Sequence, residues 1–139
     1  MDLRQLTPDL AVSPQIDTAD VAALADAGFR VLIDNRPDAE IGPELSSARM
    51  AKLAEAAGMA FHYLPFQPGS VTPDLIAGFD AALAGADGPV IAYCRSGTRS
   101  ATLWALTQAG RQPADAILST AAGAGYDLAH VAPLLHGRG

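Results

Sequence analysis

The sequence predicts a single α/β domain with a mostly parallel central sheet flanked by helices. Strand-like and helix-like segments alternate along the chain, and the segment Val90–Tyr93 is apolar throughout, as central parallel strands are. The chain has 139 residues, with 10 prolines and 13 glycines scattered as turn residues rather than in repeats. This length is enough to bury one core without disulfides or a structural metal, so we expect residues 1–139 to form one domain.

Apolar spacing and turn residues predict the elements of the first half. Thr18 caps the first helix and Gly28 ends it, because Thr favours the N-cap and Gly the left-handed position after a helix. Gly58 ends the second helix in the same way. The expected elements are a short edge strand at 10–15, a helix at 18–27, a buried strand at 29–34, a helix at 44–57 and a strand at 59–66.

The second half continues the alternation of helices and strands. Thr72 caps a third helix with Pro73 at its first position, and Ile76, Phe79 and Leu83 lie on its buried face. The helix that follows the apolar strand carries apolar residues all around its axis, which predicts burial on every side. The C-terminal third is expected to be helical, although its apolar pattern is weak.

Composition and charge narrow the functional classes. The formal net charge is −6, which disfavours nucleic acid as a partner and leaves room only for a local anion site. A single cysteine cannot form an internal disulfide, so nothing points to an oxidising compartment. No basic and apolar leader opens the chain, and no stretch approaches the roughly 20 apolar residues that span a bilayer. We therefore expect a cytoplasmic protein that does not bind membranes.

The only cysteine, Cys94, lies where the apolar strand ends and a Gly-containing loop begins, in the stretch CRSGTRS at 94–100. A free thiol is mostly protonated at neutral pH, so a nucleophilic cysteine needs positive charge nearby. Arg95 and Arg99 supply that charge, and the start of a helix adds partially positive N–H groups. We therefore predict that Cys94 is a thiolate nucleophile.

The other residues of this loop favour the binding of an anion. Gly97 lets the chain curl so that successive backbone N–H groups point inward. Ser96, Thr98 and Ser100 add hydroxyl donors, and Ser100 is placed to hydrogen-bond the thiolate. The sequence thus predicts an anion cradle with a nucleophile at its base.

Three other interpretations of Cys94 stay open. Cysteine is among the most buried residue types, so an inert core thiol is the simplest of them. The domain can also be a non-catalytic anion-binding module, or Cys94 a redox-sensing thiol. The two flanking arginines argue against an inert or redox-sensing thiol, and a mere binding module has no use for a reactive sulfur.

The motif resembles the active loops of two enzyme families. Cysteine-dependent phosphatases place five residues between the Cys and the Arg, usually after a His, whereas rhodanese-type sulfurtransferases place four. Four residues separate Cys94 from Arg99, and the preceding residue is Tyr93. The stretch at 13–40 resembles the opening of dual-specificity phosphatases.

Three stretches together, IDNRPD at 33–38, HYLPF at 62–66 and AYCRSGTRSATLWAL at 92–106, resemble one bacterial family. This is the beta-lactamase hydrolase-like protein, phosphatase-like domain family, whose members are also labelled sulfur transferases and are sometimes fused to persulfide-oxidising metallohydrolases. The resemblance covers about residues 6–110. It implies a cysteine-phosphatase fold of the dual-specificity kind with an active loop of rhodanese length.

The choice between the two chemistries depends on a proton donor. Phosphoryl transfer to a thiolate expels an alkoxide or phenoxide that needs a proton, which the phosphatases supply from an Asp after the strand equivalent to HYLPF. Here the loop at 67–72 reads QPGSVT and holds no carboxylate, while Asp74 more simply favours a helix N-terminus. Asp38 and Glu40 follow another strand, which leaves open that they reach the site, and we expect them to be solvated loop carboxylates.

Loop length and the missing acid favour a sulfurtransferase, with a phosphatase that forms a Cys94 phosphocysteine as the alternative. In the preferred mechanism Cys94 carries sulfane sulfur from a small anionic donor as a persulfide, and Arg99 clamps the donor. An external thiol, glutathione or a protein, accepts the sulfur. Arg36 is a further candidate for the site, and the competing interpretation pairs it with Asp34 or Asp38.

We expect neither a cofactor nor a metal ion. His62, His130 and His136 show no metal-like spacing with one another or with the cysteine, and we expect them to be structural or surface residues. Trp104 is expected in the core. The stretch at 121–127 is glycine-rich but lacks the Lys and the preceding strand of a phosphate loop, so we expect a turn there.

Overall fold

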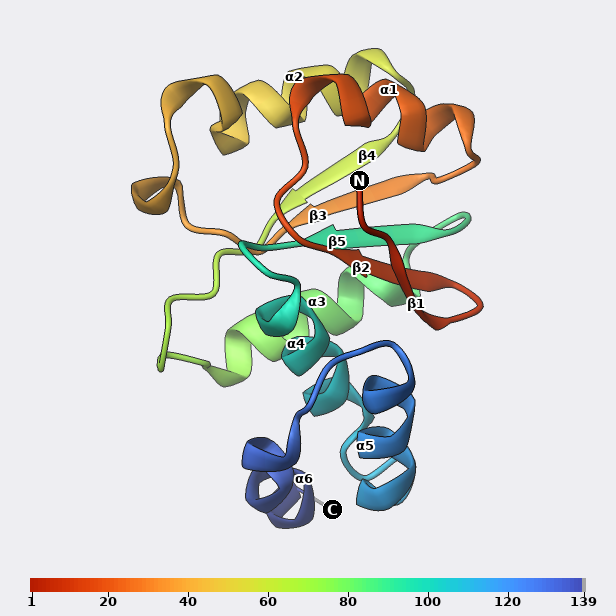
Figure 1. Cartoon of the computed structure of the whole chain (residues 1–139), viewed down its shortest axis with the longest axis vertical. Coiled ribbons are helices and arrows are strands. Elements are labelled where there is room, and N and C mark those ends of the chain that lie inside the picture. Colours follow the sequence, from red (N-terminus) through yellow and green to blue (C-terminus); the bar gives the residue numbers. More distant parts are fainter. Residues whose placement is uncertain (139) are drawn as a thin grey trace.

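A five-stranded sheet forms the centre of the computed structural model, which describes residues 1–138 (Figure 1). Its strand order is β1-β2-β5-β3-β4, with only β1 and β2 antiparallel. The strands are β1 Arg4–Thr7, β2 Leu10–Ser13, β3 Val31–Asp34, β4 Ala60–Tyr63 and β5 Val90–Tyr93. Because β2, β3, β4 and β5 are parallel, their carboxyl ends share one edge of the sheet, where parallel folds place their sites.

Helices cover both faces of this sheet (Figure 1). They are α1 Thr18–Asp26, α2 Ser47–Ala56, α3 Pro73–Ala84, α4 Thr98–Gln108, α5 Ala114–Gly123 and α6 Ala132–Arg138, with short 3₁₀ turns η1 Asp38–Glu40, η2 Pro43–Leu45 and η3 Ala129–Val131. Alternate residues of β5 point to opposite faces, so Val90 and Ala92 pack with α3 and α4 while Ile91 and Tyr93 pack with α1 and α2. The predicted α/β class with a mostly parallel sheet is confirmed.

Helix α4 lies between the sheet and the C-terminal helices. Every residue from Ser100 to Thr107 is buried, which confirms the expected burial on all sides and places Trp104 in the core. Helices α5 and α6 pack on α4 and confirm the helical prediction for the C-terminal third. No helix among residues 1–138 is long and apolar enough to cross a membrane.

The N-terminal strands differ from the sequence prediction. Segment 10–15 was expected to be an edge strand, but β1 pairs with β2 and takes the edge itself. The alternation in β1 is weak, with only Leu6 buried, so the sequence carries little strand signal there. Strand β2 is instead buried along its whole length, between β1 and β5.

Several boundaries are also corrected. The N-cap of α1 is Asp17, not Thr18, because Asp17 and Asp20 form a reciprocal capping box. Helix α2 begins at Ser47 rather than at 44, since Pro43–Leu45 forms a separate 3₁₀ turn and Ser46 caps the helix. Strand β4 is limited to Ala60–Tyr63, shorter than the expected 59–66.

Helix α3 follows the prediction at its start and departs from it on its buried face. Thr72 accepts a hydrogen bond from the Leu75 backbone N–H, and Pro73 is the first helical residue, as expected. Leu83, however, is only partly buried, while Ala82 occupies the buried position.

Candidate active site

The loop that carries Cys94 connects the carboxyl end of β5 to the first turn of α4. Gly97 is the N-cap of α4 and has φ +93°, a left-handed conformation that L side chains rarely adopt. Its backbone N–H donates a hydrogen bond to Cys94 Sγ at 3.1 Å. Cys94 is fully buried, with 0% exposure, so its sulfur lies at the base of the loop.

The first turn of α4 is left without a side-chain cap, unlike α1, α2 and α3. Ser96 Oγ and Thr98 Oγ1 hydrogen-bond each other at 3.1 Å, and the Thr98 N–H reaches Ser96 Oγ only at 3.4 Å. The N–H groups at the start of α4 are therefore poorly satisfied within the protein. An anion bound above the Cys94 sulfur would accept hydrogen bonds from these N–H groups, because helix N-termini commonly bind anions.

Ser100 is buried and does not hydrogen-bond the sulfur, contrary to the prediction. Its hydroxyl donates to Asn35 Oδ1 at 2.8 Å, and Asn35 Nδ2 donates to the Leu64 carbonyl at 2.8 Å. The Asn35 N–H also donates to the Tyr93 carbonyl at 2.8 Å. Asn35 thus links β3, β5 and α4, and Ser100 stabilises the position of the helix rather than contacting the Cys94 sulfur.

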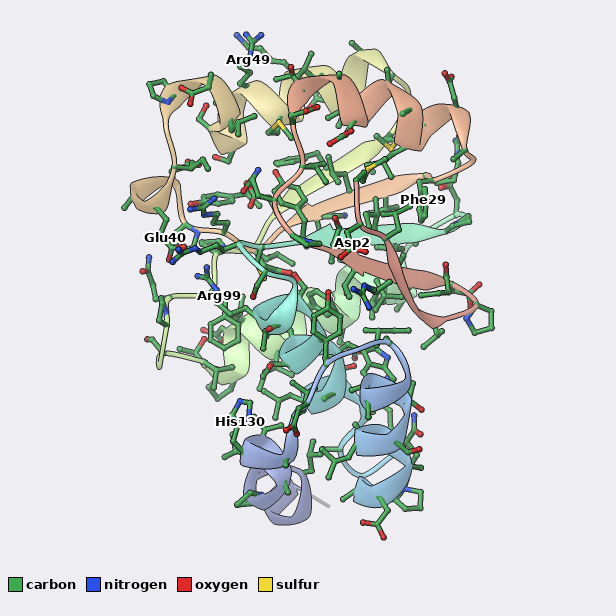
Figure 2. The ribbon with its side chains drawn as sticks, in the orientation of Figure 1. Asp2, Phe29, Glu40, Arg49, Arg99 and His130 are labelled. Atoms are coloured by element: carbon green, nitrogen blue, oxygen red, sulfur yellow. The ribbon has the colours of Figure 1, made fainter. Side chains whose placement is uncertain are left out.

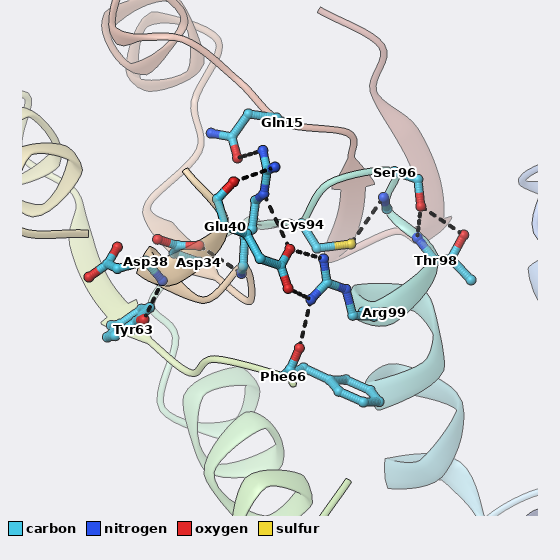
Figure 3. Close-up of polar contacts among 12 residues, drawn as sticks. Gln15, Asp34, Asp38, Glu40, Tyr63, Phe66, Cys94, Ser96, Thr98 and Arg99 are labelled. Atoms are coloured by element: carbon cyan, nitrogen blue, oxygen red, sulfur yellow. Dashed lines mark hydrogen bonds and ion pairs between the residues drawn. The ribbon is translucent and has the colours of Figure 1, made fainter. Parts of the chain in front are cut away.

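Arg99 is held in place by two groups that the sequence did not predict as its partners. Its Nη1 and Nη2 donate to the Glu40 carboxylate at 2.9 and 2.7 Å, and Nη1 also donates to the Phe66 carbonyl at 2.7 Å (Figure 3). Three of the five guanidinium N–H groups are therefore used. The two that remain, on Nε and Nη2, form the second two-pronged edge of the guanidinium, which suits an oxyanion.

Glu40 is therefore part of the site, and the expectation of a solvated loop carboxylate is wrong for it. Its side chain is only 25% exposed and lies between Arg99 and Arg36, whose Nε is 3.4 Å from Glu40 Oε1. The loop that carries Glu40 is braced by Asp38, whose carboxylate accepts hydrogen bonds from the backbone and hydroxyl of Ser47. Asp38 is therefore structural.

Arg36 joins the site through Glu40 and Gln15. Its guanidinium donates to the Glu40 backbone carbonyl at 2.9 Å and to Gln15 Oε1 at 3.3 Å. Neither Asp34 nor Asp38 pairs with this guanidinium, so the competing interpretation of Arg36 is wrong. Asp34 Oδ1 instead accepts a hydrogen bond from the Arg36 backbone N–H at 2.9 Å.

Charges within the site favour a bound anion. Arg36 and Arg99 share one carboxylate, which leaves one net positive charge beside Cys94, and the exposed Arg95 adds another. The Arg99 hydrogen bonds hold the pKa of Glu40 below its usual value, so Glu40 is ionised at neutral pH. The pKa of Arg99 is raised chiefly by Glu40, with Cys94 contributing.

A second polar group lies behind the site, on the α1–α2 side of the sheet. Asp34 is only 2% exposed, and burial raises its pKa to about 6. Burial also raises the pKa of Tyr93, and the neighbouring Asp34 charge adds to the effect. The Tyr93 side chain packs in the core beside α1 and α2.

The other residues that the sequence analysis considered are Asp74 and the three histidines. Asp74 is in the first turn of α3. His62 lies in β4 and His130 in η3, and the side chain of His136 is outside the described residues. Among the residues that the structure describes, no cluster of His, Cys, Asp and Glu is arranged to hold a metal ion.

Tyr126, from the turn after α5, reaches the Cys94 loop, which the sequence did not predict. Its hydroxyl lies so close to Gly97 that a Cβ there would overlap it. This tyrosine belongs to a weakly patterned segment, and no local signal could have placed it. For Glu40, Asn35 and Gln15 the available signal was topological, since they follow strands that neighbour β5.

The parallel sheet, the buried cysteine at the base of a strand–loop–helix turn and the braced arginine define the class of phosphatase-like proteins with a cysteine-phosphatase fold. Residues 2–111 match the model of the beta-lactamase hydrolase-like protein, phosphatase-like domain family. The chain belongs to this family, which confirms the resemblance seen in the sequence.

Relatives in two genera are similar along most of the chain. The Beta-lactamase hydrolase-like protein of Xylella fastidiosa (strain Temecula1 / ATCC 700964) is 31% identical over 130 residues, or 92% of this chain. That of Agrobacterium fabrum (strain C58 / ATCC 33970) is 34% identical over 100 residues, or 72% of this chain. The matched regions make up 30% and 23% of these longer relatives, so the chain spans less than a third of either.

Solved structures show the same fold. A Neisseria meningitidis protein, described as a candidate phosphatase, has a TM-score of 0.88 and 32% identity, covering 100% of this chain and 99% of that one. The P. aeruginosa protein TpbA, solved in complex with pTyr, has a TM-score of 0.67 and 18% identity, covering 98% and 83%. These findings favour the phosphatase interpretation over the sulfurtransferase one that the sequence preferred.

Proposed function

We propose that this protein is a cysteine-dependent phosphatase that hydrolyses phosphate monoesters through a Cys94 phosphocysteine. The proposal depends mainly on the fixed position of the Arg99 guanidinium. Arg99 is fixed by Glu40 and Phe66 and keeps one two-pronged edge for an oxyanion beside the Cys94 loop. Phosphate groups match this edge geometrically. Membership of a phosphatase-like family supports the same chemistry.

The reaction has two steps that balance without a cofactor. In the first, Cys94 Sγ attacks phosphorus, the S–P bond forms, and the bond from phosphorus to the ester oxygen breaks. The departing alcohol or phenol takes up a proton. In the second, water attacks phosphorus, the S–P bond breaks, and inorganic phosphate leaves with the thiolate restored. Arg99 and the N–H groups at the start of α4 bind the equatorial oxygens throughout.

The need to protonate the leaving group limits the class of substrate. Glu40 is ionised and shared by two arginines, and the segment at 67–72 holds no carboxylate. Among the described residues, no free carboxylic acid is therefore placed to protonate a departing alkoxide. Esters of acidic alcohols, such as phenols, need this proton least. The proposed substrates are accordingly aryl phosphates, phosphotyrosine included.

Sulfurtransfer is the second candidate, because the loop between Cys94 and Arg99 has four residues rather than five. In that reaction Cys94 attacks the outer sulfur of a donor such as thiosulfate, an S–S bond forms, and sulfite leaves with the bonding electrons. An external thiol then attacks the persulfide and removes the sulfur. Glutathione or a protein thiol would be the acceptor, and a persulfide-oxidising metallohydrolase the functional link. Both reactions need a reduced thiol, as the cytoplasm maintains.

One experiment separates these functions. Purified protein is assayed with para-nitrophenyl phosphate and with thiosulfate plus glutathione, and Cys94→Ser is the control. We expect phosphate release that Cys94→Ser abolishes, and mass spectrometry of quenched reactions should show a phosphoryl group on Cys94. A sulfur adduct with sulfite release, and no phosphate release, would establish the second candidate instead. Binding of inorganic phosphate without turnover of either substrate would identify a binding module.

A further inference from the structure

Arg36 is the second guanidinium of the site and is buried slightly more deeply than Arg99. Its side chain is 14% exposed, against 17% for Arg99 and 25% for Glu40 between them. A guanidinium in such a position loses most of its hydration, so it is stable there only where partners compensate its charge. Among the described residues, no hydrogen bond joins the Arg36 side chain to Cys94 or Arg99. Any role of Arg36 in the site therefore acts through its partners.

Two contacts from Arg36 fix Glu40. Arg36 Nη2 donates to the Glu40 backbone carbonyl at 2.9 Å and so holds the last residue of η1 in place. Arg36 Nε lies 3.4 Å from Glu40 Oε1 and is buried without a well-formed hydrogen bond in the described part of the chain, so this contact is mainly one of charge. Arg99 does most to hold the pKa of Glu40 below its usual value, and Arg36 adds to the effect. The Glu40 carboxylate therefore interacts with both cations.

Gln15 ties Arg36 to the loop after β5. Gln15 Oε1 accepts a hydrogen bond from Arg36 Nη1 at 3.3 Å, and the Gln15 backbone N–H donates to the Arg95 carbonyl at 3.2 Å. Figure 3 shows a continuous series of contacts from Gln15 to Glu40 and on to Arg99. The series starts at Arg95 and ends at Arg99, so both of its ends lie on the β5–α4 unit.

The charges in this series set how strongly an anion is held. Glu40 and Arg99 form a bidentate pair whose formal charges cancel, so an approaching oxyanion meets a carboxylate as well as a guanidinium. Figure 2 shows these two side chains next to each other. Arg36 supplies a second positive charge, which offsets the carboxylate and leaves the charge of Arg99 for the anion. Partly buried charges are screened weakly, so this compensation is felt at the anion site.

We propose that Arg36 is a positioning residue that neutralises Glu40, so that Glu40 fixes Arg99 without cancelling the charge with which Arg99 binds an oxyanion. This inference rests on the proposed phosphatase function and concerns the same anion site. A carboxylate beside a bound anion repels it unless a cation compensates the carboxylate. Arg36 is placed to be that cation, because it contacts both the backbone and the carboxylate of Glu40.

Binding of inorganic phosphate, measured by calorimetry at low ionic strength, tests this role without requiring turnover. We expect Arg36→Gln to raise the Kd for phosphate about tenfold, because a positive charge near the anion is lost. Arg36→Lys keeps the charge, and its Kd should stay within about threefold of the wild-type value. Arg49→Gln is the matched control, because Arg49 is exposed on α2 and Figure 2 places it away from Glu40 and Arg99. It should leave the Kd unchanged.

The double variant Arg36→Gln/Glu40→Gln separates compensation of charge from a structural role. If Arg36 acts by neutralising Glu40, removal of the carboxylate also removes the need for Arg36. We therefore expect the double variant to bind phosphate about tenfold more tightly than Arg36→Gln alone. Its turnover should stay low, because Arg99 then lacks its bidentate partner. An arginine with a merely structural role would not be rescued, because the second substitution removes a further contact.

A double variant that binds phosphate no more tightly than Arg36→Gln would overturn the inference, as would an Arg36→Lys variant as weak as Arg36→Gln. Circular dichroism establishes that each variant is folded. If Arg36→Gln does not fold, Arg36→Lys decides alone, since a Kd near the wild-type value supports the role and a tenfold higher one contradicts it. Wild-type protein that binds no phosphate would also overturn the inference. The proposed function fails separately, if wild-type protein binds phosphate but releases none from any ester.

Discussion

At the scale of single residues, one carboxylate organises the site. Glu40 lies between two guanidinium groups and occupies one edge of Arg99, which leaves the edge formed by Nε and Nη2 for the proposed oxyanion. Side chains that are preorganised in this way lose little entropy on substrate binding and keep their donors aligned in the transition state. Glu40 is therefore a positioning residue for Arg99.

Glu40→Gln tests this role. The amide has one oxygen acceptor in place of two and no charge, so Arg99 loses its bidentate partner and its orientation. We expect kcat/KM for para-nitrophenyl phosphate to fall about ten- to a hundredfold, in line with small displacements of catalytic groups. Glu44→Gln, in the exposed turn η2 of the same loop, is the control and should leave kcat/KM unchanged. Equal rates for Glu40→Gln and wild type would show that Arg99 needs no brace.

A buried carboxyl behind the site predicts a pH dependence of stability. Burial raises the pKa of Asp34 from 3.8 to about 6, so the folded protein binds this proton more tightly than the unfolded chain. The resulting stabilisation is full below about pH 4 and is lost as the pH rises through 6. At most about 3 kcal/mol of unfolding free energy is involved, since each unit of pKa is worth about 1.4 kcal/mol.

Asp34→Asn isolates this contribution from the other carboxyls. Urea unfolding of both proteins at pH 4.5 and pH 6.5 gives the difference between them at each pH. We expect Asp34→Asn to gain stability relative to wild type as the pH rises. A difference that does not change with pH would mean that Asp34 titrates at its ordinary pKa in the folded state.

At the scale of elements, the strand–loop–helix unit of β5 and α4 forms the proposed anion site. The loop ends in a glycine with φ +93°, and the helix that follows lacks a side-chain cap. A capping side chain would satisfy the same N–H groups that the proposed phosphate requires. The Tyr126 hydroxyl packs against Gly97 from outside, so the turn after α5 supports the loop.

Gly97→Ala should damage this unit more than an equivalent change elsewhere. The substitution combines a strained positive φ with an overlap between the new Cβ and the Tyr126 hydroxyl. We expect a loss of about 1–3 kcal/mol in unfolding free energy and the loss of most phosphatase activity. Gly28→Ala is the matched control, because Gly28 has φ +102° and open space around it. It should cost stability through strain alone and leave kcat/KM intact, and equal effects of the two variants on activity would contradict the prediction.

At the scale of the whole molecule, the C-terminal helices belong to the same core as the sheet. The family model ends at residue 111, yet the larger apolar cluster continues past it. The buried apolar residues beyond that point are Ile117, Ala121, Ala124, Tyr126, Leu128, Val131 and Leu135. Without them the outer face of α4, including Trp104 and Leu106, would be exposed to water.

A chain that ends at residue 111 should therefore not fold. Each large buried side chain contributes about 2–5 kcal/mol, and several of them exceed the 5–15 kcal/mol by which a domain is stable. We expect the shortened chain to be aggregated or unfolded by circular dichroism, whereas full-length Cys94→Ser keeps the wild-type spectrum. A cooperative unfolding transition in the shortened chain, with a midpoint near that of the full chain, would contradict this.

Local sequence predicted the parts of this protein that depend on neighbouring residues. Three features were predicted because the residues that indicate them are close together in the sequence. They are the apolar strand β5, the start of α3 at Thr72–Pro73, and the Cys94 loop with Arg99. Strand β1 was missed because an edge strand buries few residues and shows little alternation.

The parts that depend on long-range contacts could not be predicted in the same way. The bond between Glu40 and Arg99 joins residues 59 positions apart, and that between Asn35 and Ser100 joins residues 65 apart. Ser100 was expected to hydrogen-bond the Cys94 sulfur, but its hydroxyl donates to Asn35 Oδ1 instead. The preference for a sulfurtransferase relied on the loop length and on the missing acid. The fold and the family instead support the phosphatase alternative.

The complete burial of Cys94 has a consequence for the chemistry of the free thiol. A sulfur with no exposed surface is shielded from large oxidants. Small anions are the molecules that the surrounding arginines attract. The fold thereby shields the proposed nucleophile from large oxidants and favours ligands that carry negative charge.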